Sequence, residues 1–203
     1  MCRTCFGRAD LMSLLVLGLL LFLGIHSVSI VAPAWRDAQV ARLGERVWKG
    51  LYAFASLAGL LLLIYGYGMA RHAPIVLYTP PPAMRHVALL LMLPVFPLLF
   101  AAYLPGRIQR TARHPMLLAV KLWAAAHLVA NGTLADVLLF GGFLVWAVAD
   151  RISVKHRAVQ HQVPGAPPGA LNDLIALAVG LTAYVVFLLW GHAWLIGVSP
   201  MAL

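Results

Sequence analysis

The chain has 203 residues, of which 63% are hydrophobic and 10% are charged. Soluble domains carry about 25% charged residues, so this composition indicates a membrane protein and excludes a separate soluble domain. The net charge of +9 does not indicate nucleic-acid binding, because the basic residues lie at the ends of apolar segments rather than on a polar surface.

Several apolar segments are long enough to cross a bilayer, for which about 20 residues are needed. The predicted spans, in chain order, are residues 11–33, 47–70, 84–104, 116–131, 133–150 and 172–196. We therefore expect an all-α fold, a polytopic transmembrane helix bundle of about six spans. The connection 151–171 contains PGAPPG and is predicted to be a surface connector.

The N-terminal residues differ from the rest of the chain. Residues 1–11 are interpreted as an extension, with translation expected to start at Met12, and residues 12–203 as one transmembrane domain. Cys2 and Cys5 form a C-x-x-C without a βαβ context or a following histidine, so neither redox chemistry nor c-type haem attachment is predicted. The first apolar segment is expected to remain as a span rather than to be cleaved as a signal peptide.

The basic residues are distributed unevenly among the connections. Eleven of the fifteen follow the first, third and fifth segments, counted with the helix ends: Arg36, Arg42, Arg46, Lys49, Arg107, Arg110, Arg113, Lys121, Arg151, Lys155 and Arg157. The positive-inside rule places these three connections in the cytoplasm and both termini outside.

The acidic residues of the second half stand at predicted helix ends. Thr133 and Asp136 have the spacing of a capping box. Asn172 and Asp173 open the last helix, where acidic residues complement the positive end of the helix dipole. Asp150 closes the fifth segment. We interpret these residues as helix boundaries rather than as catalytic groups.

Two of the eight histidines, His26 and His127, lie deep in predicted spans. Each is about two-thirds along its segment, within roughly 6 Å of the middle of the membrane at 1.5 Å rise per residue. Hydrogen bonds to neighbouring groups, a proton relay or coordination to one metal would each satisfy such a pair. Haem is the best-fitting cofactor, because its iron takes two axial imidazoles and its porphyrin suits hydrocarbon. The remaining histidines, assigned to connections or span ends, are His72, His86, His114, His156, His161 and His192.

Small residues beside both deep histidines, and two glycines of the fifth segment, would let a flat ring approach the backbone, although they also serve ordinary helix packing. They are Gly24, Ser27, Ala124, Ala125, Ala126, Gly141 and Gly142. Arg36, Arg46 and Arg113 are candidate partners for the haem propionates at the cytoplasmic edge. Their alternative role is only to orient the chain in the membrane.

Five stretches together resemble one family over essentially residues 12–203: GIHSVSIVAPAWR, LYTPPPAMRHV, LPGRIQRTARHPMLLAVKLWAAAHLVANG, LLFGGFLVWAVADRIS and HAWLIGVSP. They resemble the NnrU family of bacterial membrane proteins. The resemblance implies an inner-membrane location and an association with denitrification, since members are encoded near nitrite and nitric oxide reductase functions.

The 15-cis-ζ-carotene isomerases resemble this family and hold a b-type haem (heme b) in the membrane. Their pattern is matched by His26 followed by Ser27, and by an RHP motif in which His114 precedes His127 by thirteen residues. The haem ligands that the resemblance implies are His26 and His127. The isomerases carry a cysteine where this chain has Ala124, so thiolate switching of the iron does not carry over.

The expected function is therefore b-type haem binding in support of nitrite or nitric oxide metabolism, by sensing, electron transfer or maturation of respiratory enzymes. One alternative is a haem-dependent isomerase acting on a hydrophobic, carotenoid-like molecule, and another is a cofactor-free membrane scaffold. The RHP motif also resembles isoprenylcysteine and phospholipid methyltransferases. We rank that reading lower, because residues 150–165 contain neither the glutamate nor the tyrosines of those enzymes.

Overall fold

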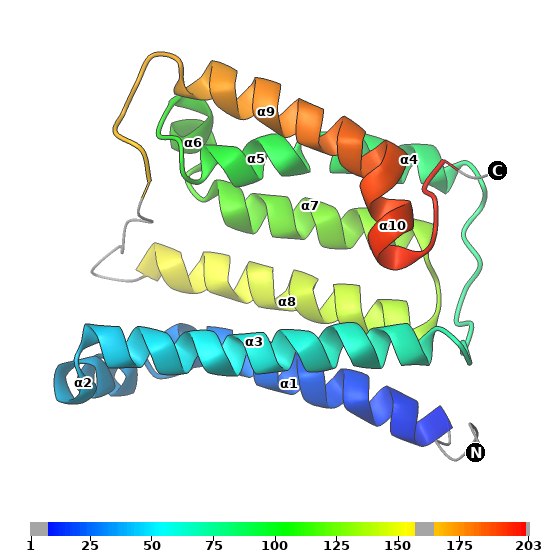
Figure 1. Cartoon of the computed structure of the whole chain (residues 1–203), viewed down its shortest axis with the longest axis horizontal. Helices are drawn as coiled ribbons and strands as arrows, with labels where there is room; N and C mark the ends of the chain where they lie inside the picture. The colour runs from blue at the N-terminus through cyan, green and yellow to red at the C-terminus, as the bar shows by residue number, and fades with distance from the viewer. Residues whose placement is uncertain (1–7, 157–164, 202–203) are drawn as a thin grey trace. The chain divides into compact units, whose positions relative to one another are not determined.

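The computed structural model describes residues 8–156 and 165–201 (Figure 1). Their secondary structure is helical, apart from one isolated antiparallel bridge between Val76 and Thr133. The all-α fold expected from the sequence is confirmed. The chain divides into two compact units, residues 1–79 with 132–154 (unit 1) and residues 80–131 with 155–203 (unit 2).

Unit 1 is built on two long helices that run antiparallel, α1 (Arg8–Val31) and α3 (Glu45–Ala70). They lie side by side in Figure 1, joined by the short helix α2 (Pro33–Leu43). Helix α8 (Leu134–His156) completes the unit and reaches α1 through side chains, as where Gly142 faces Leu19 and Leu23.

Glycines let α1 and α3 come into backbone contact. A Cβ atom on Gly18 would lie 2.5 Å from the backbone nitrogen of Leu63, and one on Gly66 would lie 2.5 Å from that of Leu15. A Cβ on Gly59 would come within 2.8 Å of the nitrogen of Phe22. Small residues at such positions let apolar helices gain close van der Waals contact, which drives helix association in lipid.

Unit 2 packs shorter helices around residues Val95, Leu98 and Ala119. Its elements are α4 (Met84–Met92), α5 (Val95–Ala101), α6 (Arg107–Ala112), α7 (Pro115–Ala130), α9 (Asn172–Val186), the π-helix η1 (Phe187–Gly191) and α10 (His192–Ile196). Pro94 separates α4 from α5, since proline removes a helical hydrogen bond. Helix α5 contacts both α7 and α9.

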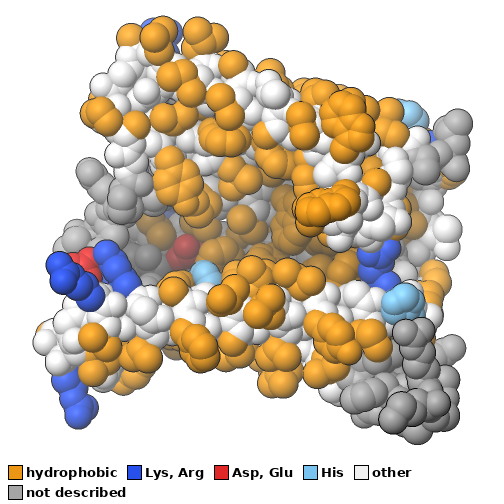
Figure 2. Space-filling model, in the orientation of Figure 1, with side chains coloured by type: hydrophobic (Ala, Val, Ile, Leu, Met, Phe, Trp, Pro, Cys, Tyr) orange, Lys and Arg blue, Asp and Glu red, His pale blue; other side chains and the backbone are white. Residues whose placement is uncertain are grey.

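Five helical segments of the described chain are long and apolar enough to cross a membrane. They are Met12–Val31, Glu45–Ala70, Met84–Ala101, Leu134–His156 and Asn172–Ile196. The outward face of α3 is covered by hydrophobic side chains such as Phe54, Leu61 and Ile64, as lipid contact requires (Figure 2). The remaining predicted span forms α7, whose 16 residues extend about 24 Å, shorter than a hydrocarbon core of about 30 Å.

One helix was not predicted, and one predicted boundary is wrong. The connection after the first span contains helix α2, which starts anew at Pro33 because a proline suits the first helical position and restrains the residue before it. Helix α8 does not close at Asp150 and Arg151 but continues to His156. No glycine or proline interrupts residues 151–156, and Lys155 and His156 suit the negative end of the helix dipole.

Gly66→Ala is expected to lower the free energy of unfolding by about 1–3 kcal/mol, because the added methyl group forces α1 and α3 apart. The matched control is Gly68→Ala on the same helix, where a Cβ meets nothing within 4 Å. That control should be neutral or stabilising by up to about 1 kcal/mol, since alanine favours the helix. Thermal unfolding of the detergent-solubilised proteins, followed by circular dichroism, measures both; equal losses would contradict the packing argument.

Candidate functional site

His26 lies on α1 in unit 1, and its ring is held by its own helix. Its Nδ1 lies 2.7 Å from the carbonyl oxygen of Phe22, one turn earlier. The aromatic ring of Phe22 also stacks on the imidazole of His26, with ring centroids 4.3 Å apart. Because a carbonyl oxygen only accepts, Nδ1 carries the proton and the lone pair of a neutral ring is on Nε2.

Two further aromatic side chains of unit 1 surround His26. The Tyr52 ring of α3 has its centroid 5.3 Å away and the Trp146 ring of α8 has its centroid 6.0 Å away, both edge to face. The imidazole is thus contacted from α3 and α8 as well as from its own helix, which restricts its orientation.

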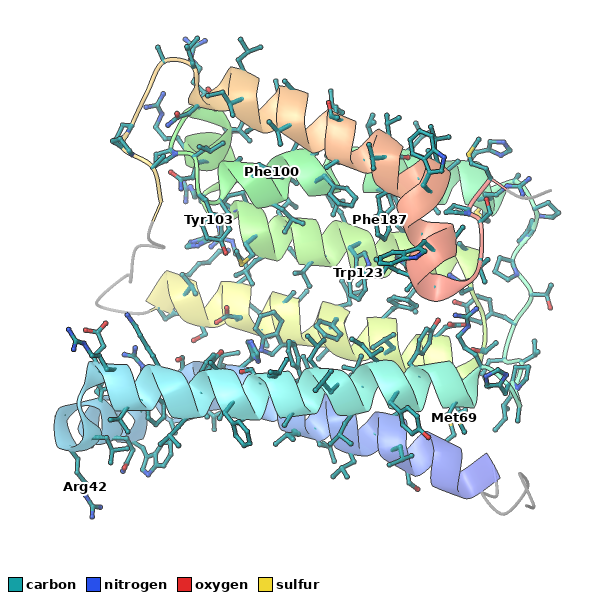
Figure 3. All side chains as sticks on the ribbon, viewed as in Figure 1. Arg42, Met69, Phe100, Tyr103, Trp123 and Phe187 are labelled. Atoms are coloured by element: carbon teal, nitrogen blue, oxygen red, sulfur yellow. The ribbon has the colours of Figure 1, made fainter. Side chains whose placement is uncertain are left out.

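His127 lies on α7 in unit 2 and repeats the local arrangement of His26. Its Nδ1 lies 2.8 Å from the carbonyl oxygen of Trp123, again four residues earlier. The ring centroids of Trp123 and His127 are 5.3 Å apart. Trp123 is labelled on α7 in Figure 3. Here too the hydrogen bond fixes the proton on Nδ1 and the lone pair on Nε2.

Both histidines therefore have the tautomer that metal-binding histidines adopt, in which Nδ1–H donates to an oxygen and Nε2 is the ligand atom. A lone pair on an imidazole nitrogen is the donor through which a histidine holds haem iron. In residues 8–156 and 165–201, no group of three or more His, Cys, Asp or Glu side chains is placed to hold a metal ion.

The three arginines predicted as propionate partners lie on different elements. Arg36 of α2 forms an ion pair with Asp37, with Nη1 2.7 Å from Oδ1. Arg46 is exposed in the first turn of α3. Arg113 is exposed at the end of α6 with a φ of 59°, a backbone conformation that costs energy for a residue other than glycine. Their role toward a cofactor stays a prediction.

The glycines among the predicted small residues differ in what surrounds them. A Cβ atom on Gly24 or on Gly141 would meet nothing within 4 Å. One on Gly142 would meet Leu23 of α1 at 3.5 Å, so this glycine serves helix packing. The Ser27 hydroxyl donates to the carbonyl oxygen of Leu23 at 2.6 Å.

The other predicted boundary residues fall as follows. His114 is the N-cap of α7, directly before Pro115 at the first helical position, as the RHP motif predicted. His192 opens α10, and its Nδ1 lies 2.6 Å from the carbonyl oxygen of Val198. His156 ends α8 rather than lying in a loop. Cys2, Cys5 and His161 lie outside the described residues.

The family model of the NnrU protein matches residues 14–200 of the chain, which takes in the greater part of both units. The chain belongs to the NnrU family. No curated protein and no solved structure matches it. The family inferred from the sequence motifs is thus confirmed, and both candidate histidines lie within the matched region of this NnrU protein.

The NnrU chain also contains a polar cluster that the motifs revealed only in part. The predicted capping box is present: the Asp136 carboxylate accepts from the Thr133 backbone at 2.9 Å, and the Asp136 backbone donates to the Thr133 hydroxyl at 3.3 Å. The second carboxylate oxygen accepts from the Tyr67 hydroxyl of α3 at 2.6 Å. Asp136 is 5% exposed. Its buried hydrogen bond with Tyr67 joins the end of α3 to the start of α8.

Backbone hydrogen bonds join the connection after α3 to the residues that begin α8. The Leu77 and Tyr78 backbones donate to the carbonyl oxygen of Gly132 at 2.8 and 3.1 Å, and the Leu134 backbone donates to that of Ile75 at 2.8 Å. A Cβ on Gly132 would overlap the Tyr78 carbonyl oxygen. Only glycine fits this close approach.

Asp173 has a second role besides the predicted one. It stands in the first turn of α9, as predicted, and its carboxylate also accepts from the backbones of Arg107 and Ile108 at 2.8 and 3.0 Å, and so caps α6. The Asn172 amide donates to the carbonyl oxygen of Pro105 at 2.8 Å. The residues that open α9 therefore hold α6 as well.

Tyr67→Phe removes the hydroxyl that reaches Asp136 and leaves a buried carboxylate oxygen without this donor. We expect the free energy of unfolding to fall by about 1–3 kcal/mol. Tyr65→Phe is the matched control, because Tyr65 lies on the same helix and is 60% exposed; it should change stability by less than about 0.5 kcal/mol. Chemical unfolding in detergent measures both, and a Tyr67→Phe protein as stable as its control would contradict this role.

Proposed function

We propose that this NnrU-family membrane protein binds one b-type haem through His26 and His127 and supports nitrite or nitric oxide metabolism. The observation that carries the proposal is the matched pair of hydrogen bonds from Nδ1 to the carbonyl oxygen four residues earlier. Each bond orients its ring and directs the lone pair to Nε2. The chain belongs to the NnrU family, and the setting of denitrification is what the resemblance to that family implies.

The protein's contribution to such a site is orientation and basicity. Donation of Nδ1–H to a carbonyl oxygen makes Nε2 a better electron donor and holds the ring against rotation. Stacking on Phe22 further restrains His26, and the Trp123 ring lies beside His127. When bound, haem would supply an iron centre suited to electron transfer or, after displacement of one imidazole, to binding nitric oxide.

The proposal includes the orientation of the chain in the bacterial inner membrane. Residues 33–49, residues 107–113 and the end of α8 together carry most of the basic residues, and the positive-inside rule assigns these regions to the cytoplasm. Cysteine labelling from outside intact cells should then modify single-cysteine variants at residue 73 but not at residue 42. Labelling with the opposite pattern would reverse the assigned orientation.

His26→Ala and His127→Ala should each remove or severely weaken haem binding, since these imidazoles would supply the protein's bonds to the iron. His161→Ala is the control and should retain the wild-type haem content. The pyridine haemochrome assay on detergent-purified protein gives the haem-to-protein ratio of each variant. Equal haem content in all three would exclude the assigned ligands, and loss in His114→Ala alone would assign the ligand to the RHP motif instead.

The spectrum of the wild-type protein separates the candidate functions. A nitric-oxide-induced shift of the Soret band with release of one histidine supports sensing, and its absence favours electron transfer or maturation. A protein that remains colourless after haem reconstitution would leave the cofactor-free scaffold. Conversion of a poly-cis carotene by the reduced holoprotein would establish the isomerase alternative.

A further inference from the structure

Helix α2 (Pro33–Leu43) connects two membrane-spanning helices at the same end of unit 1. It begins directly after α1 and is followed by α3 after the single residue Gly44, whose φ is 81°. None of its residues is buried. Since α1 and α3 are both long and apolar enough to cross a bilayer, a helix of 11 residues between their ends belongs at the membrane surface.

Helix α2 and the first turn of α3 carry more positive than negative charge. Residues 33–49 contain four basic side chains and two acidic ones. The acidic residues are already engaged, Asp37 with Arg36 and Glu45 with Lys49, each pair at 2.7 Å. Neither of the remaining arginines, Arg42 and Arg46, takes part in an ion pair within the described residues. Figure 3 shows the Arg42 side chain projecting away from the helix.

Aromatic and aliphatic side chains accompany these arginines. The rings of Trp35 on α2 and Trp48 on α3 pack edge to face with centroids 5.9 Å apart, and Trp35 is 53% exposed. Val47 and Leu51 on α3 are similarly exposed. Tryptophan favours the depth of lipid headgroups, where its ring contacts acyl chains and its N–H meets water.

We propose that α2 and the first turn of α3 bind the headgroups of anionic phospholipids through Arg42 and Arg46, with Trp35 and Trp48 at headgroup depth. Arginine is suited to phosphate because its planar group donates two parallel hydrogen bonds. A second copy of this chain fits less well, because it would present the same excess of positive charge. The inference does not depend on haem binding.

Native mass spectrometry of the full chain in detergent tests the proposal with phosphatidylglycerol and with phosphatidylcholine of the same acyl chains. The wild-type protein should bind phosphatidylglycerol more tightly. The Arg42→Ala/Arg46→Ala variant should lose about fivefold in phosphatidylglycerol affinity for each arginine removed. Its affinity for phosphatidylcholine should not change.

Two further variants keep this result specific. Arg107→Ala/Arg110→Ala removes the same charge from α6 and should retain wild-type binding. Arg42→Lys/Arg46→Lys should restore only part of the lost affinity, because lysine keeps the charge but not the two parallel hydrogen bonds. Equal binding of the two lipids, or an equal loss in the α6 variant, would overturn the proposal.

Arg46 is also a predicted propionate partner, and the same samples separate the two roles. A lipid site requires that phosphatidylglycerol affinity fall about fivefold in Arg42→Ala alone, because Arg42 has no predicted role toward haem. A fall in haem content with unchanged lipid binding would instead assign Arg46 to the cofactor and overturn the lipid site.

Discussion

Polar side chains inside the apolar helices must find their hydrogen-bond partners without water, and this constraint shapes the structure. His26, Ser27, His127 and Thr182 each bond to the carbonyl oxygen four residues earlier. A side chain that turns back along its own helix has a hydrogen-bond partner whatever packs against it. For a hydroxyl, this bond only removes the free-energy cost of a polar group without a partner. For a histidine it also selects the tautomer, and so decides which nitrogen is available to a metal.

Other polar groups are satisfied across elements, and these bonds join helices that the sequence separates widely. The Tyr67 hydroxyl and the Asp136 carboxylate fasten α3 to α8 in unit 1. In unit 2, the Asp173 carboxylate caps α6, and the Tyr184 hydroxyl donates to the carbonyl oxygen of Leu89 at 3.0 Å. Because an unmet polar group costs most where water is absent, these few bonds contribute to the register of the helices that they join.

The environment of His26 depends on helix packing as well as on its own hydrogen bond. Phe22, which supplies the carbonyl oxygen and the stacked ring, lies where α1 meets α3 at Gly59. A larger residue at 59 would displace the backbone that holds the imidazole. The glycines that bring α1 and α3 together therefore also position the candidate ligand, so packing and function are linked at this point.

Much of the architecture follows from sequence, because hydrophobic length, proline positions and capping residues act locally. They predicted the spanning helices, the start of α7 at Pro115 and the box of Thr133 and Asp136. They also singled out His26 and His127, since an ionisable group deep in an apolar run is conspicuous in any fold. These features depend on the chain within a few residues, which is the range over which sequence patterns are informative.

Only the tertiary structure decided how distant residues serve one another. Nothing near Tyr67 in the sequence indicates that its hydroxyl reaches Asp136, and nothing near Asp173 indicates that it caps α6. The contact of Gly66 with Leu15 is equally invisible, since a glycine in a helix predicts no particular neighbour. These interactions depend on which helix faces overlap. That choice is made by the summed packing of many side chains, not by any one segment.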